Sequence, residues 1–169
     1  MNDLTELEFR MLELNERLSV IAKRPVDITK PNWVALLKQR PHPLDEAGAR
    51  AEAETLVADL AQEYEHGEDG TRGVIRKMFA TYGAFAWAAT MMGVPATAAQ
   101  FRRRLVVYSM HNQGTDTRDA ILELQGLCGQ ARAAGINLAP LLTEVAAFSS
   151  DENRFGMGST RGLLLRAAA

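Results

Sequence analysis

Cysteine is nearly absent from this sequence, which excludes disulfide-stabilised proteins and proteins with a zinc site made of several cysteines. The 169 residues contain a single cysteine, Cys128. A lone thiol forms no intramolecular disulfide and supplies no zinc site made of several cysteines. The three histidines, His42, His66 and His111, are far apart, and none stands in a paired metal-binding spacing. We therefore expect no disulfide framework, no metal site and no cofactor.

Positive charge is not in excess either. The chain has 19 Lys and Arg residues against 21 Asp and Glu residues, which gives a formal net charge of −2 at pH 7. Proteins that coat nucleic acids are usually strongly basic. The best basic cluster, Arg102–Arg104, occupies three consecutive residues, which point in different directions on a helix and form no single phosphate clamp. Nucleic acid is therefore not among the expected partners.

Long apolar runs are missing as well. The longest uncharged stretch, residues 78–95, is slightly short for a membrane span and is rich in Ala, Thr and Gly rather than Leu and Ile. The first residues carry charges every few positions, whereas a secretory signal has an unbroken apolar segment. We expect no membrane partner and a cytoplasmic location, with residues 78–95 in a buried core helix.

What the sequence does contain is an ordinary globular composition with a strong helical period. Hydrophobic residues make up 47% and charged residues 24%, which argues against disorder, and the length is that of one domain over residues 1–169. Apolar residues recur at spacings of three and four, as on one face of a helix. The first such stripe consists of Leu4, Leu7, Met11, Leu14, Leu18 and Ile21.

Turn residues divide the chain into further segments. We predict a first helix over residues 3–24, a proline-rich connector over 25–43, a helical core over 44–148, and a polar loop with a C-terminal helix over 149–169. Asn2 or Asp3 is expected to cap the first helix, and a short helix is expected between Pro31 and Pro41. No segment alternates apolar and polar residues for long enough to form a strand. The predicted fold class is all-α, a single-domain bundle of seven to eight helices.

Glycines and capping residues set the boundaries inside the helical core. Gly67 and Gly135 are expected to end two helices, and residues 67–70 are expected to form a turn. Caps are expected at Thr71, at Thr97 in a capping box with Gln100, at Asn137, and at Ser159 or Thr160.

Two of the core helices have inner faces that the periodicity defines. The helix before Gly67 should bury Ala49, Ala53, Leu56, Val57, Leu60 and Tyr64. The helix before Gly135 should bury Ile121, Leu122, Leu124, Leu127, Cys128 and Ala131. Cys128 is therefore expected to be a buried, unreactive thiol.

Charge is unevenly distributed along the chain. Residues 45–69 hold nine acids and one base, Arg50, whereas residues 71–112 hold six bases and no acid. Four acids are spaced by seven, seven and four residues, which places them on one helix face: Asp45, Glu52, Asp59 and Glu63.

Two interpretations of this acidic face are open. The acidic and basic helices can pack side by side and pair their charges, or leave a solvated outer face. Alternatively, the acids form a docking face that attracts a basic partner by electrostatic steering. The candidate docking residues are Glu52, Asp59, Glu63, Glu65, Glu68 and Asp69.

A second candidate site precedes the last helix. Gly156 and Gly158 stand before a helix N-terminus, where backbone N–H groups can cradle an anion, and Arg102–Arg104 would add positive charge. The pattern lacks the lysine of a P-loop. A tight turn followed by an N-cap explains the same residues, with Arg161 bound to a nearby acid such as Asp151.

Two stretches of the sequence resemble known proteins. They are PNWVALLKQRPHPLD, Pro31–Asp45, and SSDENRFGMGSTRGLLL, Ser149–Leu165. Both resemble small uncharacterised bacterial proteins of polymorphic-toxin loci, of the Rhs and type VI secretion kinds, and the resemblance spans most of the chain. Proteins in that setting are often immunity proteins, which bind one cognate toxin and block it. The resemblance implies this setting and carries over no functional residue.

Three hypotheses of function follow. The leading one is a non-enzymatic immunity protein that neutralises a cognate secreted toxin, with a basic surface, by direct one-to-one binding. The first alternative is a helical scaffold or adaptor in a secretion or regulatory assembly, which would leave part of the first-helix stripe exposed. The second alternative is a protein that binds a small anionic ligand or a nucleotide.

Overall fold

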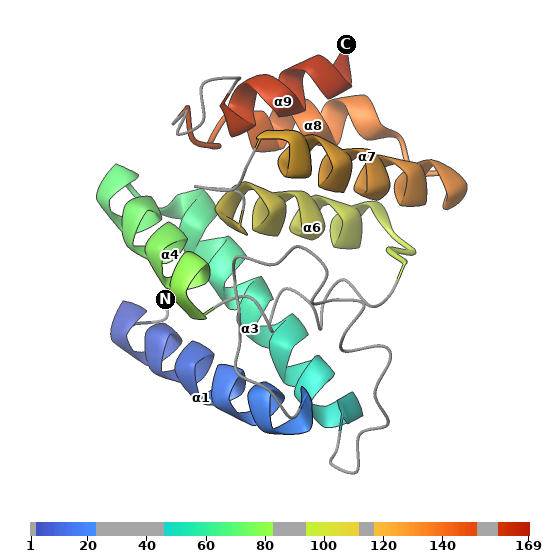
Figure 1. Ribbon diagram of the computed structural model, residues 1–169. Coiled ribbons are helices and arrows are strands. Elements are labelled where there is room, and N and C mark those ends of the chain that lie inside the picture. The colour runs from blue at the N-terminus through green and yellow to red at the C-terminus, as the bar shows by residue number, and fades with distance from the viewer. Residues whose placement is uncertain (1–2, 23–45, 83–93, 112–116, 152–158) are drawn as a thin grey trace. The chain divides into compact units, whose positions relative to one another are not determined.

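The computed structural model describes residues 3–22, 46–82, 94–111, 117–151 and 159–169. These residues form seven α-helices and no strand, which confirms the all-α fold class. The helices are α1 (Leu4–Ala22), α3 (Glu46–His66), α4 (Asp69–Tyr82), α6 (Ala98–His111), α7 (Thr117–Ala133), α8 (Leu138–Ala146) and α9 (Thr160–Ala168) (Figure 1). The connector over residues 25–43 and its short helix lie outside the described residues. No helix in the described ranges is both long enough and apolar enough to cross a membrane.

The helices belong to two compact units, residues 1–92 and residues 93–169. The first unit contains α1, α3 and α4, and the second contains α6, α7, α8 and α9. The helices of each unit pack against one another. The single domain expected over residues 1–169 stays a prediction.

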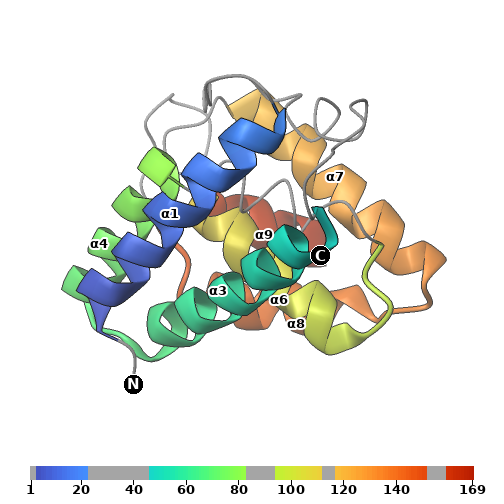
Figure 2. The same ribbon diagram turned by 90° about the horizontal axis from the view of Figure 1, so that it is seen from below.

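In the first unit, each of the three helices contacts the other two (Figures 1 and 2). The predicted apolar stripe of α1 is buried at Leu7, Met11, Leu14 and Leu18. All six residues predicted for the inner face of α3 are buried, and α4 adds Ile75, Met78 and Phe79. Burying these side chains removes apolar surface from water, which is the main stabilising contribution to such a core.

The ends of the helices in this unit are held by side chains. Asp3 caps α1, because its Oδ1 accepts a hydrogen bond of 3.0 Å from the backbone N–H of Thr5. Arg72 caps the C-terminal end of α3. Its Nε donates to the Tyr64 carbonyl at 2.9 Å, and its Nη2 donates to the Glu65 carbonyl at 3.2 Å. These carbonyls belong to the last turn of α3, which leaves them without intrahelical partners.

The start of α4 differs from the prediction of a turn over residues 67–70 with a cap at Thr71. The helix begins at Asp69, and the Arg72 N–H already donates to the Glu68 carbonyl at 2.9 Å. A Cβ on Gly67 would approach the Glu63 carbonyl oxygen to 2.7 Å, so only glycine allows so short a connection. The carboxylate of Asp69 in the first turn also favours a helix start there, through the helix dipole.

In the second unit, the predicted capping box at the start of α6 is confirmed. The Gln100 N–H donates to Thr97 Oγ1 at 3.2 Å, and Gln100 Oε1 accepts from the backbone N–H groups of Thr97 at 3.2 Å and Ala96 at 2.8 Å. α6 then buries nearly every side chain from Phe101 to Met110, and α8 contacts the other three helices of the unit.

The end of α7 is also confirmed, but two of the six residues predicted for its inner face are not buried: Ile121 is partly exposed and Leu122 is exposed. Gly135 has φ +73°, and the N–H groups of Gly135 and Ile136 donate to the carbonyls of Arg132 and Ala131, which is a Schellman ending. Leu122 was expected to face inward and is 55% exposed. It lies two residues from buried Leu124, about 200° around the helix, so both cannot share one face.

The last two helices differ in how they begin. Asn137 occupies the N-cap of α8 as predicted, although its side chain forms no capping hydrogen bond. Ser159, rather than Thr160, caps α9, because Ser159 Oγ accepts from the Gly162 N–H at 3.0 Å. Thr160 is buried in the first turn.

The capping box gives the first testable prediction. Thr97→Ala should lower the free energy of unfolding by about 1 kcal/mol, because the first turn of α6 loses its acceptor. The control is Thr143→Ala, since Thr143 donates only to the Ala139 carbonyl of its own helix. Urea denaturation measures both variants. Equal stability of Thr97→Ala and the wild type would show that the capping box does not hold α6.

His111 gives a prediction of pH dependence. It is the last residue of α6, and burial lowers the pKa of its imidazole from 6.5 to about 4. The unfolded chain therefore takes up a proton more readily than the folded one, so stability falls as the pH drops from about 6.5 towards 4. The shift corresponds to an upper limit of about 3 kcal/mol.

The measurement for His111 is the free energy of unfolding against pH, for the wild type and for His111→Gln. The wild type should lose more stability than the variant between pH 7 and pH 4. Parallel curves for the two proteins would contradict the assignment, because every other titrating group is shared between them.

Candidate functional site

Two of the predicted docking acids face α1 within the first unit. Arg10 Nη1 lies 2.8 Å from Asp59 Oδ2, and Arg17 forms an ion pair with Glu52. The spacing of seven residues does place Glu52 and Asp59 on one face of α3, as expected from the sequence. That face, however, is turned towards the arginines of α1. The partners of these acids are therefore not the basic residues of segment 71–112, which had been considered for charge pairing.

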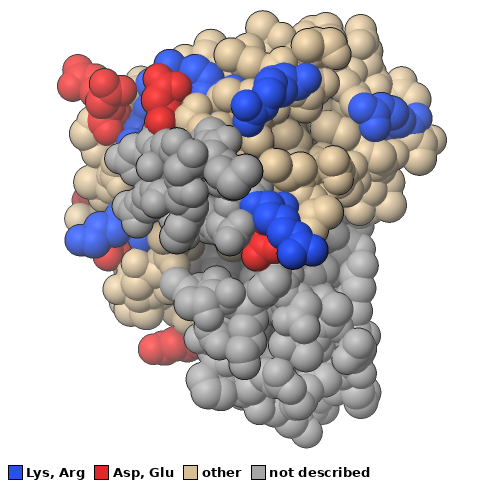
Figure 3. All heavy atoms as spheres, turned by 45° about the horizontal axis from the view of Figure 1, so that its top comes forward, with Lys and Arg blue, Asp and Glu red and all other residues tan. Residues whose placement is uncertain are grey.

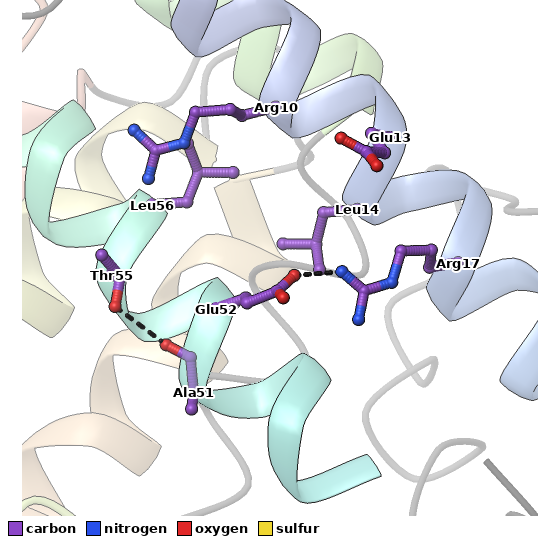
Figure 4. A pocket seen from close by; sticks show the side chains of 8 residues that line it. All are labelled: Arg10, Glu13, Leu14, Arg17, Ala51, Glu52, Thr55 and Leu56. Carbon is purple, nitrogen blue, oxygen red and sulfur yellow. Dashed lines mark hydrogen bonds and ion pairs between the residues drawn. The ribbon is translucent and has the colours of Figure 1, made fainter. Parts of the chain in front are cut away.

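The side chains around these ion pairs enclose a shallow pocket of about 280 Å³ between α1 and α3 (Figure 4). Its apolar base is formed by Leu14 and Leu56, and the Arg17–Glu52 pair reaches from one helix to the other. Both arginines that line it already have a carboxylate partner. We therefore assign this pocket to the packing of α1 on α3 rather than to a ligand.

The other four predicted acids lie at the end of α3 and the start of α4. Glu63 and Glu65 are only partly exposed, and the carbonyl of Glu65 accepts from Arg72. Glu68 and Asp69 are exposed, and Asp69 lies 3.7 Å from Arg72 Nη1 across one turn. Of the six candidates, Glu68 and Asp69 are thus the two that face solvent without a role in joining helices.

A further acidic surface lies on α1, which the sequence reasoning missed. Its outer face consists of Glu8, Phe9, Leu12, Glu13 and Glu16, all exposed. Phe9 is 65% exposed and Leu12 is 38% exposed. The three glutamates form no ion pair with any residue that the structure describes. This combination of an exposed aromatic ring with surrounding acids is hereafter called the α1 outer face.

The signal for this face was present in the sequence. The buried stripe of α1 runs through Leu7, Met11, Leu14 and Leu18, and neither Phe9 nor Leu12 belongs to it. Large apolar residues outside the stripe of an amphipathic helix point away from the core.

Of the arginines considered for an anion site, Arg102 joins two helices of the second unit. Its Nε lies 2.7 Å from Glu144 Oε1, which links α6 to α8. Arg104 is buried. Arg161, at the start of α9, donates to the carbonyl of Ala146, the last residue of α8, at 3.0 Å and to the carbonyl of Ser149 at 2.9 Å.

Arg161 also forms the ion pair with Asp151 that the sequence suggested, at 2.7 Å. The glycines Gly156 and Gly158 lie outside the described residues. The local ion pair is therefore confirmed, and Arg161 is already bound to three groups of its own chain. Figure 3 shows basic side chains at several separate places on one face, and acidic side chains at the upper left and at scattered positions elsewhere.

Burial favours the neutral forms of Cys128 and Tyr108 in this unit. Cys128 is buried as expected, and burial raises the pKa of its thiol. Burial also raises the pKa of Tyr108, whose hydroxyl donates to the Ala120 carbonyl at 2.8 Å. In the part of the chain that the structure describes, no group of three or more His, Cys, Asp or Glu side chains is placed to hold a metal ion.

The ion pairs between α1 and α3 lead to a prediction about the candidate acids. A double-mutant cycle of Arg10→Gln and Asp59→Asn should give a coupling of about 0.5–1 kcal/mol, because the pair is only partly exposed. A matched cycle of Arg10→Gln with Glu16→Gln should give none. Urea denaturation at low and high salt measures both, and salt should reduce the first coupling. Equal couplings in the two cycles would mean that Asp59 interacts with Arg10 no more strongly than Glu16 does.

Comparisons with known proteins add no relative. No protein-family model and no curated protein matches the sequence, and no solved structure matches the fold. Inferences about function therefore depend on the chemistry of this chain's own side chains.

Proposed function

We propose that this chain is a non-enzymatic binding protein, and specifically a cytoplasmic immunity protein that neutralises one cognate secreted toxin. It would bind the toxin one to one and cover or distort the toxin's active site. The observation that carries the proposal is the α1 outer face, where an exposed Phe9 is surrounded by acids without ion pairs to described residues. The bacterial toxin-locus setting comes from the sequence resemblance.

The chemistry of this face favours a basic protein partner. Aromatic side chains frequently act as the energetic centre of an interface, because they bury a large area with few rotatable bonds. Surrounding acids attract a basic surface and orient it during the approach. Glu68 and Asp69 add exposed negative charge to the same unit.

The distribution of charge over the whole sequence supports the same conclusion. Residues 1–92 contain 15 acids and 11 bases, whereas residues 93–169 contain 6 acids and 8 bases. The negative charge of the protein is therefore concentrated in the unit that carries the α1 outer face. A field of one sign over a unit speeds association with a partner of opposite sign.

The scaffold hypothesis has less support. It required part of the first-helix stripe to be exposed, whereas Leu7, Met11, Leu14 and Leu18 are buried. Leu4 is partly exposed, and the Ile21 side chain is not among those that the structure describes. The hypothesis of an anion site at the Ser149–Arg161 loop with Arg102–Arg104 is weakened as well, since Arg102 binds a carboxylate and Arg161 binds a carboxylate and carbonyls of the chain.

Growth rescue tests the immunity proposal. A toxin encoded beside this chain is expressed in a bacterial host with and without the chain, and rescue of growth is expected with the wild-type protein. The toxin's affinity is then measured for the wild type and for the triple variant Glu8→Gln, Glu13→Gln and Glu16→Gln. The triple variant should bind at least tenfold more weakly, about 1.4 kcal/mol. This loss should shrink at high salt.

A matched control separates the effect of the α1 outer face from the effect of the protein's net charge. The variant Ala133→Lys, Thr143→Lys and Ala147→Lys changes the charge by the same amount at exposed positions of the other unit. It should bind like the wild type. Phe9→Ala should weaken binding at least tenfold with an unchanged melting temperature. Failure to rescue growth would refute immunity, whereas rescue with unaltered affinities would refute only the α1 outer face.

A further inference from the structure

A cleft in the second unit has no role in the proposed docking. α9 packs mainly against α8 and contacts α7 over a shorter length (Figure 1). A cleft of about 540 Å³ lies between α7 and α9. Its lining residues on α7 recur at spacings of three and four, and so do those on α9, so the cleft lies between one face of each helix.

The cleft has an apolar floor. Leu124 and Cys128 of α7 and Leu163 of α9 line it and are buried, and Ile121 is partly exposed beside them. A protonated thiol behaves as a small apolar group, so Cys128 continues the hydrophobic surface. An alkyl chain or ring placed here would be removed from water on several sides.

The rim of the cleft is basic. Arg132 of α7 and Arg166 of α9 line it, and both are exposed. Neither forms an ion pair with a residue that the structure describes, in contrast to Arg102 and Arg161 of the same unit. Two guanidinium groups without carboxylate partners, on opposite walls of one cleft, are suited to an anionic group.

We propose that this cleft binds a small amphipathic anion of the fatty-acid type, with its apolar part on the floor and its carboxylate at Arg132 and Arg166. The volume lies in the range of small-molecule sites, which combine a mostly apolar lining with a few polar groups that orient the ligand. The site uses arginines other than those expected from the sequence. It is also independent of the α1 outer face, which belongs to the other unit.

Calorimetric titration of the full chain with dodecanoate tests the proposal, below the concentration at which the probe forms micelles. Arg132→Gln/Arg166→Gln should raise the dissociation constant at least tenfold. The control Arg50→Gln/Lys77→Gln makes the same charge change at residues that do not line the cleft and should leave the dissociation constant unaltered. Dodecan-1-ol, which has the chain without the charge, should bind at least tenfold more weakly than dodecanoate.

A thiol placed at an exposed lining residue reports where the probe binds. Gln125 lines the cleft and is exposed. In the variant Gln125→Cys/Cys128→Ala, saturating dodecanoate should slow alkylation of the new thiol by iodoacetamide, and the same should hold when Arg50→Gln/Lys77→Gln is added. No binding of dodecanoate, equal binding by the two double variants, equal binding of the alcohol, or an unchanged alkylation rate with dodecanoate bound would each overturn the proposal. None of these results bears on growth rescue, so the two proposals fail separately.

Discussion

The register of α1 against α3 is the constraint on which the first unit depends. Arg10 and Arg17 are seven residues apart, and so are their partners Asp59 and Glu52, which they meet in antiparallel order. Between them Leu14 is buried in the core. With this register set, the opposite side of α1 must face solvent, because a helix buried on one side presents its other residues outward. The exposure of the α1 outer face thus follows from the same contacts that stabilise the unit.

Arginine serves two different purposes in the second unit. Arg102 and Arg161 join helices, the first to a carboxylate of α8 and the second to carbonyls at and beyond its end. The guanidinium groups of both therefore have partners within the chain. Arg132 and Arg166 line the cleft between α7 and α9, and no carboxylate of the described residues pairs with them. An arginine of this unit is thus structural when it reaches a carboxylate or carbonyl of a neighbouring element, and available to a ligand when no described residue offers one.

Local features of the fold could be predicted because neighbouring residues determine them. The capping box of Thr97 and Gln100, the Schellman ending at Gly135 and the buried stripe of α1 each involve residues within one or two turns. The predicted start of α4 was wrong by three residues, since Arg72 and the carbonyls of α3 let the connection shorten. The prediction that Leu122 is buried was wrong because the inner face of α7 has room for fewer than the six apolar residues predicted for it.

The sequence by itself determined the helical class, most helix ends and the faces that carry apolar or acidic residues. These depend on a period of 3.6 residues and on capping chemistry, both of which act over a few residues. Only the tertiary structure decided which charges remain available. Glu52 and Asp59 share a face in the sequence, but whether that face meets solvent or an arginine depends on a helix at least 35 residues away. Charge pairing between helices is a long-range contact, and spacing within one helix does not specify it.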